Sequence, residues 1–166
     1  MLRSVNPPGM LVRPIAPSDE AAYLAILETT SAEDRYCRFF HAVDHFDPNE
    51  VRHFVEERSD MIGMIAFEGA APLGAAHAAL LDERTAELAI VVARGERHHG
   101  VGAAMLEALI VELKRRRYQR LIACALRENT PFGTLAKHAG FTIEKADGGT
   151  VRWVLSLSSH EPAPSP

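Results

Sequence analysis

One stretch, residues 86–113 (AELAIVVARGERHHGVGAAMLEALIVEL), constrains this chain most strongly because it combines a strand, a tight turn and a long helix. The apolar, partly β-branched run at residues 88–92 is typical of a buried strand. From Val101 onward apolar residues recur at helical spacing. Gly100 and Gly102 leave the backbone open between the two elements, where the first helical amides carry partial positive charge. This arrangement indicates a site for a phosphorylated ligand.

Length and composition limit the remaining possibilities. A chain of 166 residues with 47% hydrophobic and 24% charged residues suits one globular domain. Its net charge of -4 argues against a nucleic-acid binder. No apolar stretch is long enough to span a bilayer, and the N-terminus lacks the apolar core of a signal peptide. The two cysteines do not form a disulfide framework. We therefore expect a cytoplasmic protein that binds neither nucleic acid nor membrane.

Patterns along the chain predict a mixed α/β sheet with helices on its faces. Strands are expected at 10–15, 61–67, 73–81, 87–92, 120–125, 141–145 and 150–157, and helices are expected to begin at Ser18 or Asp19, Ser31, Asp47-Pro48, Val101 and Thr130. The strands between 61 and 92 have short connections, which predicts an antiparallel meander. We expect an irregular lead-in at 1–9, one domain at 10–157 and a disordered tail at 158–166.

The motif Arg97-x-x-Gly100-x-Gly102, placed between that strand and that helix, resembles the acyl-CoA-binding signature of the GNAT superfamily of N-acetyltransferases. Gly140-Phe141 is similar to that family's usual ending of its last helix. The resemblance covers roughly residues 10–157. It implies the GNAT acyl-CoA N-acyltransferase fold, with about seven strands and about four to five helices.

A second likeness is narrower. Residues 31–40 (SAEDRYCRFF), Ala86-Glu87 and residues 126–129 (LREN) resemble the GNAT domains of the bacterial protein-lysine acetyltransferases, the Pat-like enzymes. In that group the domain is often fused to an acyl-CoA synthetase-like or cyclic-nucleotide-binding module. The likeness implies a protein lysine as acceptor, with an acyl-CoA synthetase as one possible partner, and acetyl-CoA as cosubstrate without any metal.

The resemblance assigns cosubstrate contacts residue by residue. The pyrophosphate of CoA would be held by Arg97, His98, His99, Gly100, Val101 and Gly102, and the pantetheine arm by backbone groups of Ile90, Val91 and Val92, with Asn129 and Phe132 on its other side. Each assignment has a purely structural alternative. The two glycines can allow tight strand-to-helix packing, and Asn129 can be a plain helix cap.

Glu87 is the candidate for chemistry. A lysine amine is charged at pH 7 and must lose a proton to attack a thioester. A carboxylate at the start of the strand can accept that proton directly or through water. The resemblance implies the same role for Glu87. The alternative is a solvated acid or an ion-pair partner of Arg84.

Two further positions bear on mechanism. Many GNAT enzymes carry a tyrosine acid in the last helix, whereas Ala136 stands there in this chain, so CoA would leave as a thiolate. Cys124 lies in an apolar strand with no evident base beside it, which favours a buried, inert thiol. His41 and His45 are four residues apart but lack a third ligand, so no zinc site is expected.

The leading hypothesis is an acetyl-CoA-dependent N-acetyltransferase acting on a protein lysine by direct attack of the amine. One alternative is a GNAT enzyme for a small amine, such as a polyamine or an antibiotic. Another is an acyl-CoA-binding sensor module without turnover. Oligomeric state and acyl-chain preference stay open at this point.

Overall fold

A computed structural model describes residues 6–39, 44–96 and 99–158, without the side chains of residues 36–39. Its centre is a seven-stranded mixed sheet in the order β1-β2-β3-β4-β5-β7-β6, which confirms the predicted fold class. The strands are β1 Met10–Pro14, β2 Met61–Glu68, β3 Ala71–Leu80, β4 Thr85–Val92, β5 Arg120–Leu126, β6 Thr142–Asp147 and β7 Thr150–Ser156. The helices are α1 Glu20–Glu28, α2 Ala32–Phe39, α3 Pro48–Val55, α4 Val101–Arg115 and α5 Thr130–Ala139, with a 3-10 turn at Pro17–Asp19 before α1.

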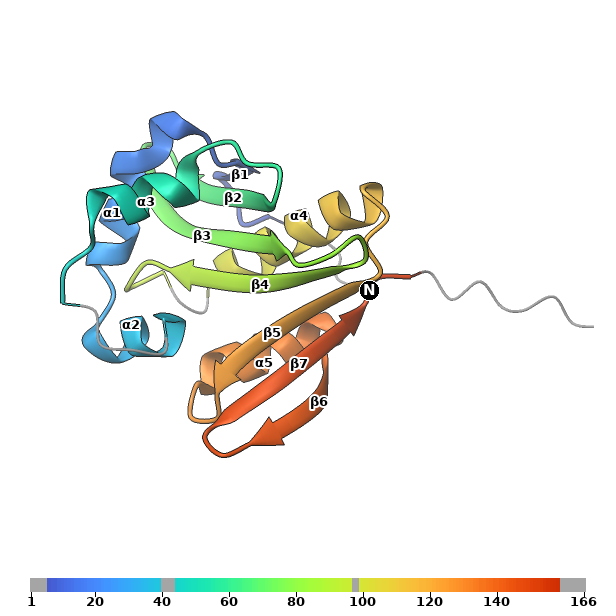
Figure 1. The fold of residues 1–166 in the computed structure, drawn as a ribbon. Coiled ribbons are helices and arrows are strands. Elements are labelled where there is room, and N and C mark those ends of the chain that lie inside the picture. Colours follow the sequence, from blue (N-terminus) through green and yellow to red (C-terminus); the bar gives the residue numbers. More distant parts are fainter. Residues whose placement is uncertain (1–5, 40–43, 97–98, 159–166) are drawn as a thin grey trace, which may run out of the picture.

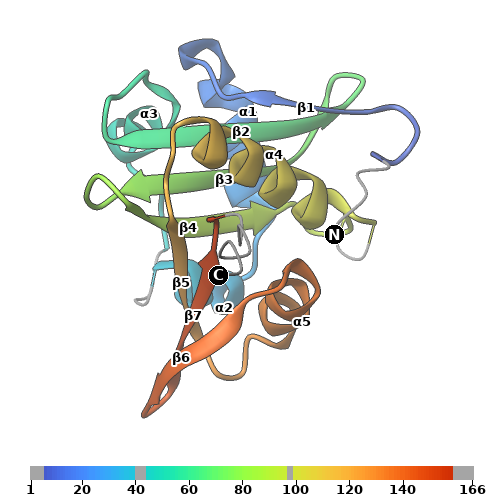
Figure 2. The same ribbon diagram turned by 90° about the vertical axis from the view of Figure 1, so that its right-hand side faces the viewer.

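The helices divide between the two faces of the sheet. Figures 1 and 2 show α4 and α5 on one face and α1, α2 and α3 on the other. Within the described residues, no helix is both long enough and apolar enough to cross a membrane. The predicted lead-in and tail fall largely outside the described residues, so that division of the chain stays a prediction.

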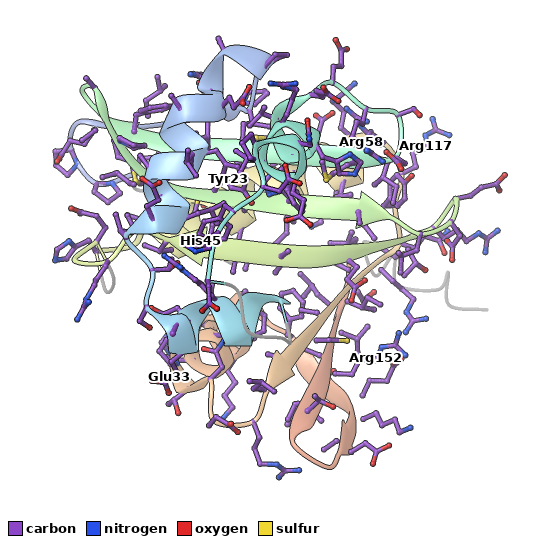
Figure 3. The ribbon with its side chains drawn as sticks, turned by 60° about the vertical axis from the view of Figure 1, so that its left-hand side comes forward. Tyr23, Glu33, His45, Arg58, Arg117 and Arg152 are labelled. Atoms are coloured by element: carbon purple, nitrogen blue, oxygen red, sulfur yellow. The ribbon has the colours of Figure 1, made fainter. Side chains whose placement is uncertain are left out.

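Each face has its own hydrophobic cluster. On the first, α4 buries Met105, Leu106 and Leu109 completely against the sheet. On the second, Tyr23 and Ile26 of α1 pack with residues of α3, β2 and β3. Figure 3 shows Tyr23 beneath the helices of this second face. Because both faces are covered, β2 to β4 are held as a rigid platform.

The sheet is interrupted between β4 and β5. The two strands are parallel and pair over only three residues, of which Glu87 opposite Ile122 is the last. Beyond that pair the strands separate, and Figure 1 shows them meeting at one end and apart at the other. β5 continues to pair with β7 from Arg120 to Leu126. The separated edges form the walls of a cleft.

Asp19 is the N-cap residue of α1, as predicted, although its carboxylate accepts hydrogen bonds from Arg13 and from the Ala16 amide and none from the amides of α1. The helix at Asp47-Pro48, which the sequence pattern extends to about Arg58, ends earlier, at Val55. The N-cap of α3 is Asp47, whose side chain accepts from the Asn49 amide at 2.8 Å, and this agrees with its predicted start.

Candidate active site

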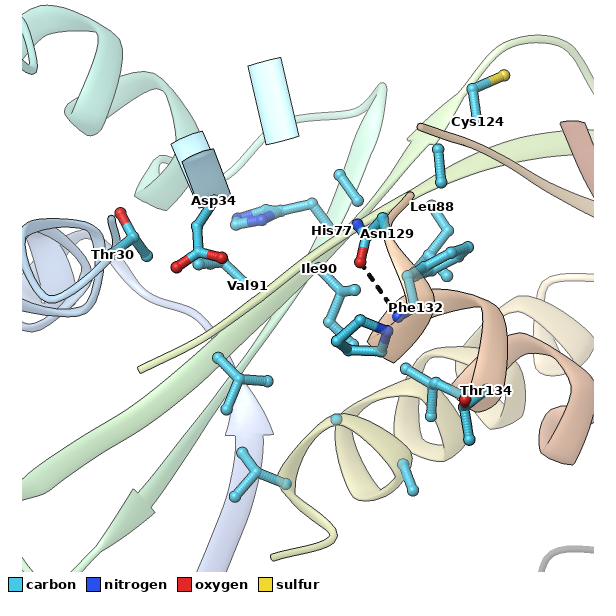
Figure 4. A pocket seen from close by; sticks show the side chains of 18 of the residues that line it. Thr30, Asp34, His77, Leu88, Ile90, Val91, Cys124, Asn129, Phe132 and Thr134 are labelled. Carbon is cyan, nitrogen blue, oxygen red and sulfur yellow. Dashed lines mark hydrogen bonds between the residues drawn. The ribbon is translucent and has the colours of Figure 1, made fainter. Parts of the chain in front are cut away.

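The cleft between β4 and β5 has a volume of about 930 Å³, which suits a small-molecule cosubstrate. It is lined by β4, the start of α4, the end of β5, much of α5 and parts of α2, α3, β2 and β3. Figure 4 looks into it, with Leu88 and Ile90 of β4 facing Asn129 and Phe132 across the opening. Most of the helices and strands that surround the gap between β4 and β5 therefore contribute residues to the cleft.

The register of β4 decides which backbone groups reach the cleft. Ala93 N donates to Leu73 O, and Thr85 O accepts from Leu81 N. Pairing between β3 and β4 is regular between these points, so the odd-numbered residues of β4 direct their N–H and C=O groups to β3. The even-numbered residues direct theirs to the other edge, where pairing with β5 ends at Glu87.

This register changes the predicted backbone set. Ile90 and Val92 present their N–H and C=O groups to the cleft, as the pantetheine assignment requires. Val91 does not, because its backbone pairs with Ala75 and its side chain packs in the second cluster. Leu88, which the sequence analysis did not name, directs its C=O to this edge just beyond the last pair with β5. Alternation along a strand could have found it only once the pairing with β3 was known.

The start of α4 forms the closed end of the cleft. Gly100 is the N-cap residue in a left-handed conformation with φ 80°, and it has no side chain to cap the helix. Val101 is buried beside it, whereas the side chain of His99 is exposed and contacts Glu96 at 3.5 Å. A fifteen-residue helix with no side-chain cap leaves its first amides available to an anion. Arg97 and His98 lie outside the described residues, so their predicted roles stay predictions.

Gly102 lies beside both β4 and α5. A Cβ at this position would lie 3.4 Å from Leu135 Cδ2 and 3.7 Å from Val92 Cγ2, which is ordinary van der Waals contact. The packing around Gly102 therefore does not require a glycine, and the alternative of tight strand-to-helix packing is not supported at this position.

Asn129 caps α5, which was one of the two roles predicted for it from the sequence. Its side chain accepts from the Phe132 amide at 3.2 Å, drawn as a dashed line in Figure 4. Both residues also line the cleft. α5 ends at Gly140 in a left-handed conformation with φ 94°, as predicted. The cap therefore fixes the wall opposite β4.

Glu87 lies where the two strands part and borders the cleft, half-buried. Its pairing places its side chain on the face covered by α1, α2 and α3, the same face as His77 and Cys124. Within the described part of the chain Glu87 forms no ion pair, so the alternative pairing with Arg84 is not seen.

Cys124 has a carboxylate on its side of the sheet, which the sequence pattern did not indicate. Glu87 of β4 and Arg152 of β7 lie on the same face as Cys124, and Arg152 is its cross-strand partner. Burial raises the pKa of the Cys124 thiol, and the Glu87 carboxylate raises it further, while Arg152 acts in the opposite direction. The thiol is therefore held in its neutral form, which agrees with a non-nucleophilic cysteine.

The side of the cleft away from α4 and α5 is acidic. Glu33 and Asp34 of α2 line it together with Glu87, and Figure 3 shows Glu33 on α2. No lysine or arginine occurs among the described residues that line the cleft. Buried His77 contributes to its base, where Nε2 lies 2.9 Å from the carbonyl oxygen of Phe54. This side suits a cationic group.

The described residues were also compared with the ligand sets that metal ions require. In the described ranges, no group of three or more histidine, cysteine, aspartate or glutamate side chains is placed to hold an ion. His41, one of the pair considered above, lies outside these ranges.

A cleft between separated parallel strands, closed by an uncapped helix N-terminus, defines a site for an extended phosphorylated cosubstrate. The sequence profile of the acetyltransferase (GNAT) family matches residues 20–141. The chain belongs to this family, whose members use acetyl-CoA for N-acetylation.

Solved structures agree in fold. The GNAT domain of PAT from S. lividans is 24% identical, with a TM-score of 0.81 over 87% of this chain and 89% of that one. The yncA protein of Salmonella typhimurium, solved with its cofactor acetyl-CoA, is 19% identical, with a TM-score of 0.73 over 91% and 95%. The ribosomal-protein-S18-alanine N-acetyltransferase from Escherichia coli is 16% identical, with a TM-score of 0.70 over 93% and 97%. These likenesses confirm the fold and leave the acceptor amine open.

Proposed function

We propose that this protein transfers the acetyl group of acetyl-CoA to the side-chain amine of a lysine in a protein substrate, with Glu87 as general base. The observation that carries the proposal is the position of Glu87 at the last paired residue before β4 and β5 separate. A carboxylate at this point borders both the cosubstrate cleft and the acidic acceptor side.

The cleft fits the parts of acetyl-CoA. The uncapped start of α4 suits the pyrophosphate, because Gly100 turns the chain there and the first amides are available. The edge of β4 suits the pantetheine amides, because Ile90 and Val92 direct their backbone groups, and Leu88 its C=O, to an edge beyond the last pair with β5. Phe132 and the Asn129 cap form the opposite wall.

The acceptor side fits an amine. A lysine entering from the face of α1 and α2 meets Glu33, Asp34 and Glu87, and no lysine or arginine among the described lining residues. Carboxylates attract the ammonium form and, at Glu87, can remove its proton. The resulting amine forms a bond to the thioester carbonyl carbon, the C–S bond breaks, and CoA leaves as a thiolate, while the nitrogen, positively charged after its attack, releases its second proton to water. Water then supplies the proton, since Ala136 occupies the place of the usual tyrosine and is buried.

The choice of a protein lysine rests on two supports. The first is the likeness of residues 31–40 to Pat-like enzymes, in the segment that forms α2. The second is the similarity in fold to the GNAT domain of PAT from S. lividans. An acyl-CoA synthetase is the protein substrate that we propose first.

The test is an acetylation assay with purified protein and acetyl-CoA. Three acceptors are compared: an acyl-CoA synthetase from the same organism, the organism's lysate proteins, and spermidine. We expect new ε-N-acetyl-lysine sites by peptide mass spectrometry and matching release of free CoA. Heat-inactivated protein gives the non-enzymatic background.

Two results would contradict the proposal. Acetylation of spermidine without any enzyme-dependent acetyl-lysine would identify a small-amine acetyltransferase. Saturable acetyl-CoA binding without CoA release on any acceptor would identify a sensor module.

A further inference from the structure

We propose that the acceptor lysine lies in an extended segment of the substrate protein and that an acidic residue about three positions from it pairs with Arg152. The inference rests on the proposed function and deepens it, because it states which protein segments the site accepts. It is drawn from the strand register around Glu87 and from the charge of the surface beside it.

A line of side chains crosses the sheet on the face that carries Glu87. It passes over β2, β3, β4, β5 and β7 through the direct pairs Met61 with Ala79, Ala79 with Glu87, Glu87 with Ile122, and Ile122 with Val154. Directly paired residues project to the same face of a sheet. Glu87 therefore stands in the middle of a line that runs across the strands.

This line lies at the margin of the helical layer. α1 and α3 pack on the sheet around Ile65, Ala75 and Val91, each of which is further along its strand than the member of the line. The members on β2, β3 and β4 are only partly buried, and they border the cleft. A segment of a substrate protein can therefore lie along the line and place one side chain at Glu87.

The two ends of the line differ in chemistry. On the β2 and β3 side the members are apolar, Ala79 and Met61. On the β5 and β7 side Arg120 and Arg152 flank the line, and each projects to the same face as the member on its own strand. Their side chains are 46% and 47% exposed, and Figure 3 shows Arg152 extending from β7. The line therefore has an apolar end and a basic end.

Arg152 is the less fully paired of the two arginines. Its described ion pair is with Glu144 at 3.7 Å, whereas Arg120 donates a hydrogen bond to the same carboxylate. An exposed pair at such a distance contributes little. The Arg152 guanidinium can therefore exchange Glu144 for a carboxylate of the bound segment.

The spacing of the strands sets the position of that carboxylate in the substrate. β4 and β7 are separated by β5 alone, so the side chains of the two strands are about 10 Å apart. An extended segment advances about 3.3 Å per residue, so this distance corresponds to about three residues. An acidic residue on the opposite side of the lysine would meet Ala79 and Met61 instead. We therefore expect the preference on one side of the lysine only.

The test uses peptides that contain the acetylated lysine of the acceptor found above, with aspartate or asparagine at the third position before or after it. The value of kcat/KM for each peptide is measured with wild type, Arg152→Gln and Arg152→Glu. Arg115→Glu is the matched control, because Arg115 is also exposed and ion-paired but lies on α4. Thermal unfolding checks that each variant is folded.

We expect wild type to favour aspartate over asparagine about two- to fivefold in kcat/KM at one of the two positions, as for an exposed ion pair. Arg152→Gln should abolish this preference, and Arg152→Glu should make asparagine the better residue. Arg115→Glu should keep the wild-type preference. The acetyl-CoA KM should be the same in all variants.

Equal kcat/KM for aspartate and asparagine peptides, or a preference that persists in folded Arg152→Glu, would overturn this inference while leaving lysine acetylation intact. Peptides that stay unmodified although the whole acceptor protein is acetylated would also overturn it, because an extended segment would then not suffice. If no whole protein is acetylated, the proposed function fails first. The two failures are therefore distinguishable.

Discussion

Glu87 on β4 and Ile122 on β5 form the last pair of a three-residue parallel ladder, and the sheet opens directly beyond them. A carboxylate at this position borders the acceptor side, while the backbone edge that follows it borders the cosubstrate. The two halves of the proposed reaction therefore meet at one residue pair.

Gly100 should matter for both stability and cosubstrate binding. Its φ of 80° is unfavourable for a side chain, so Gly100→Ala should lower the free energy of unfolding by about 1 kcal/mol. It should also weaken acetyl-CoA binding about tenfold, because the amides at the start of α4 would move. Urea unfolding and calorimetric titration measure the two effects.

Gly69 offers a matched control. It has φ 58° in the turn between β2 and β3, and a Cβ there would meet nothing within 4 Å. Gly69→Ala should cost similar stability without changing acetyl-CoA affinity. Equal acetyl-CoA affinity in the two variants would contradict the placement of the pyrophosphate.

Asn129 should act both as a cap and as a wall of the cleft. Asn129→Ala removes the acceptor for the Phe132 amide and should cost about 1 kcal/mol of stability. It should also raise the acetyl-CoA KM, because the start of α5 lines the cleft. Steady-state kinetics with varied acetyl-CoA measure this.

Asp47→Ala is the comparison, since Asp47 caps α3 in the same way. It should lower stability by a similar amount and leave the acetyl-CoA KM at the wild-type value. A KM that rises equally in both variants would show that cap loss acts through general destabilisation.

The buried Asp19 should make stability depend on pH. Hydrogen bonds from Arg13 at 2.7 Å, together with the Ala16 amide, hold the pKa of Asp19 below its ordinary value of 3.8, against the effect of burial. Its contribution is therefore complete above the unfolded-state pKa and is lost as the pH falls through the folded-state pKa. Asp19→Asn should cost about 1–3 kcal/mol near neutral pH.

Urea unfolding of wild type and Asp19→Asn at about pH 7 and about pH 3 tests this, and the gap between them should narrow at the lower pH. Asp60→Asn is the control, because Asp60 forms a similar pair with Arg58 on an exposed surface. It should destabilise the protein far less at neutral pH. A gap for Asp19→Asn that does not change with pH would contradict the ion-pair account.

Local chemistry explains which features the sequence could predict. Asp47, Asn129 and Gly140 each act within one turn of a helix end, so their positions follow from neighbouring residues. The strand, turn and helix around Gly100 follow for the same reason. The mixed sheet follows from the order of these elements.

Features that join distant residues could not be predicted in this way. The orientation of the β4 backbone is set by pairing with β3, which directs the backbone groups of Val91 to β3 and those of Ile90 and Val92 to the cleft. The placement of Glu87 and Cys124 on one face of the sheet depends on the pairing of β4 with β5. The Asp19 carboxylate accepts hydrogen bonds from Arg13, which lies on β1, and none from the amides of α1.

The most direct test of the central claim is the turnover of Glu87→Gln. This change removes the proton acceptor and keeps the size of the side chain. The account predicts a fall in kcat of about a hundredfold or more, with calorimetric acetyl-CoA affinity within about twofold of wild type. A folded Glu87→Gln variant with wild-type kcat would contradict the account.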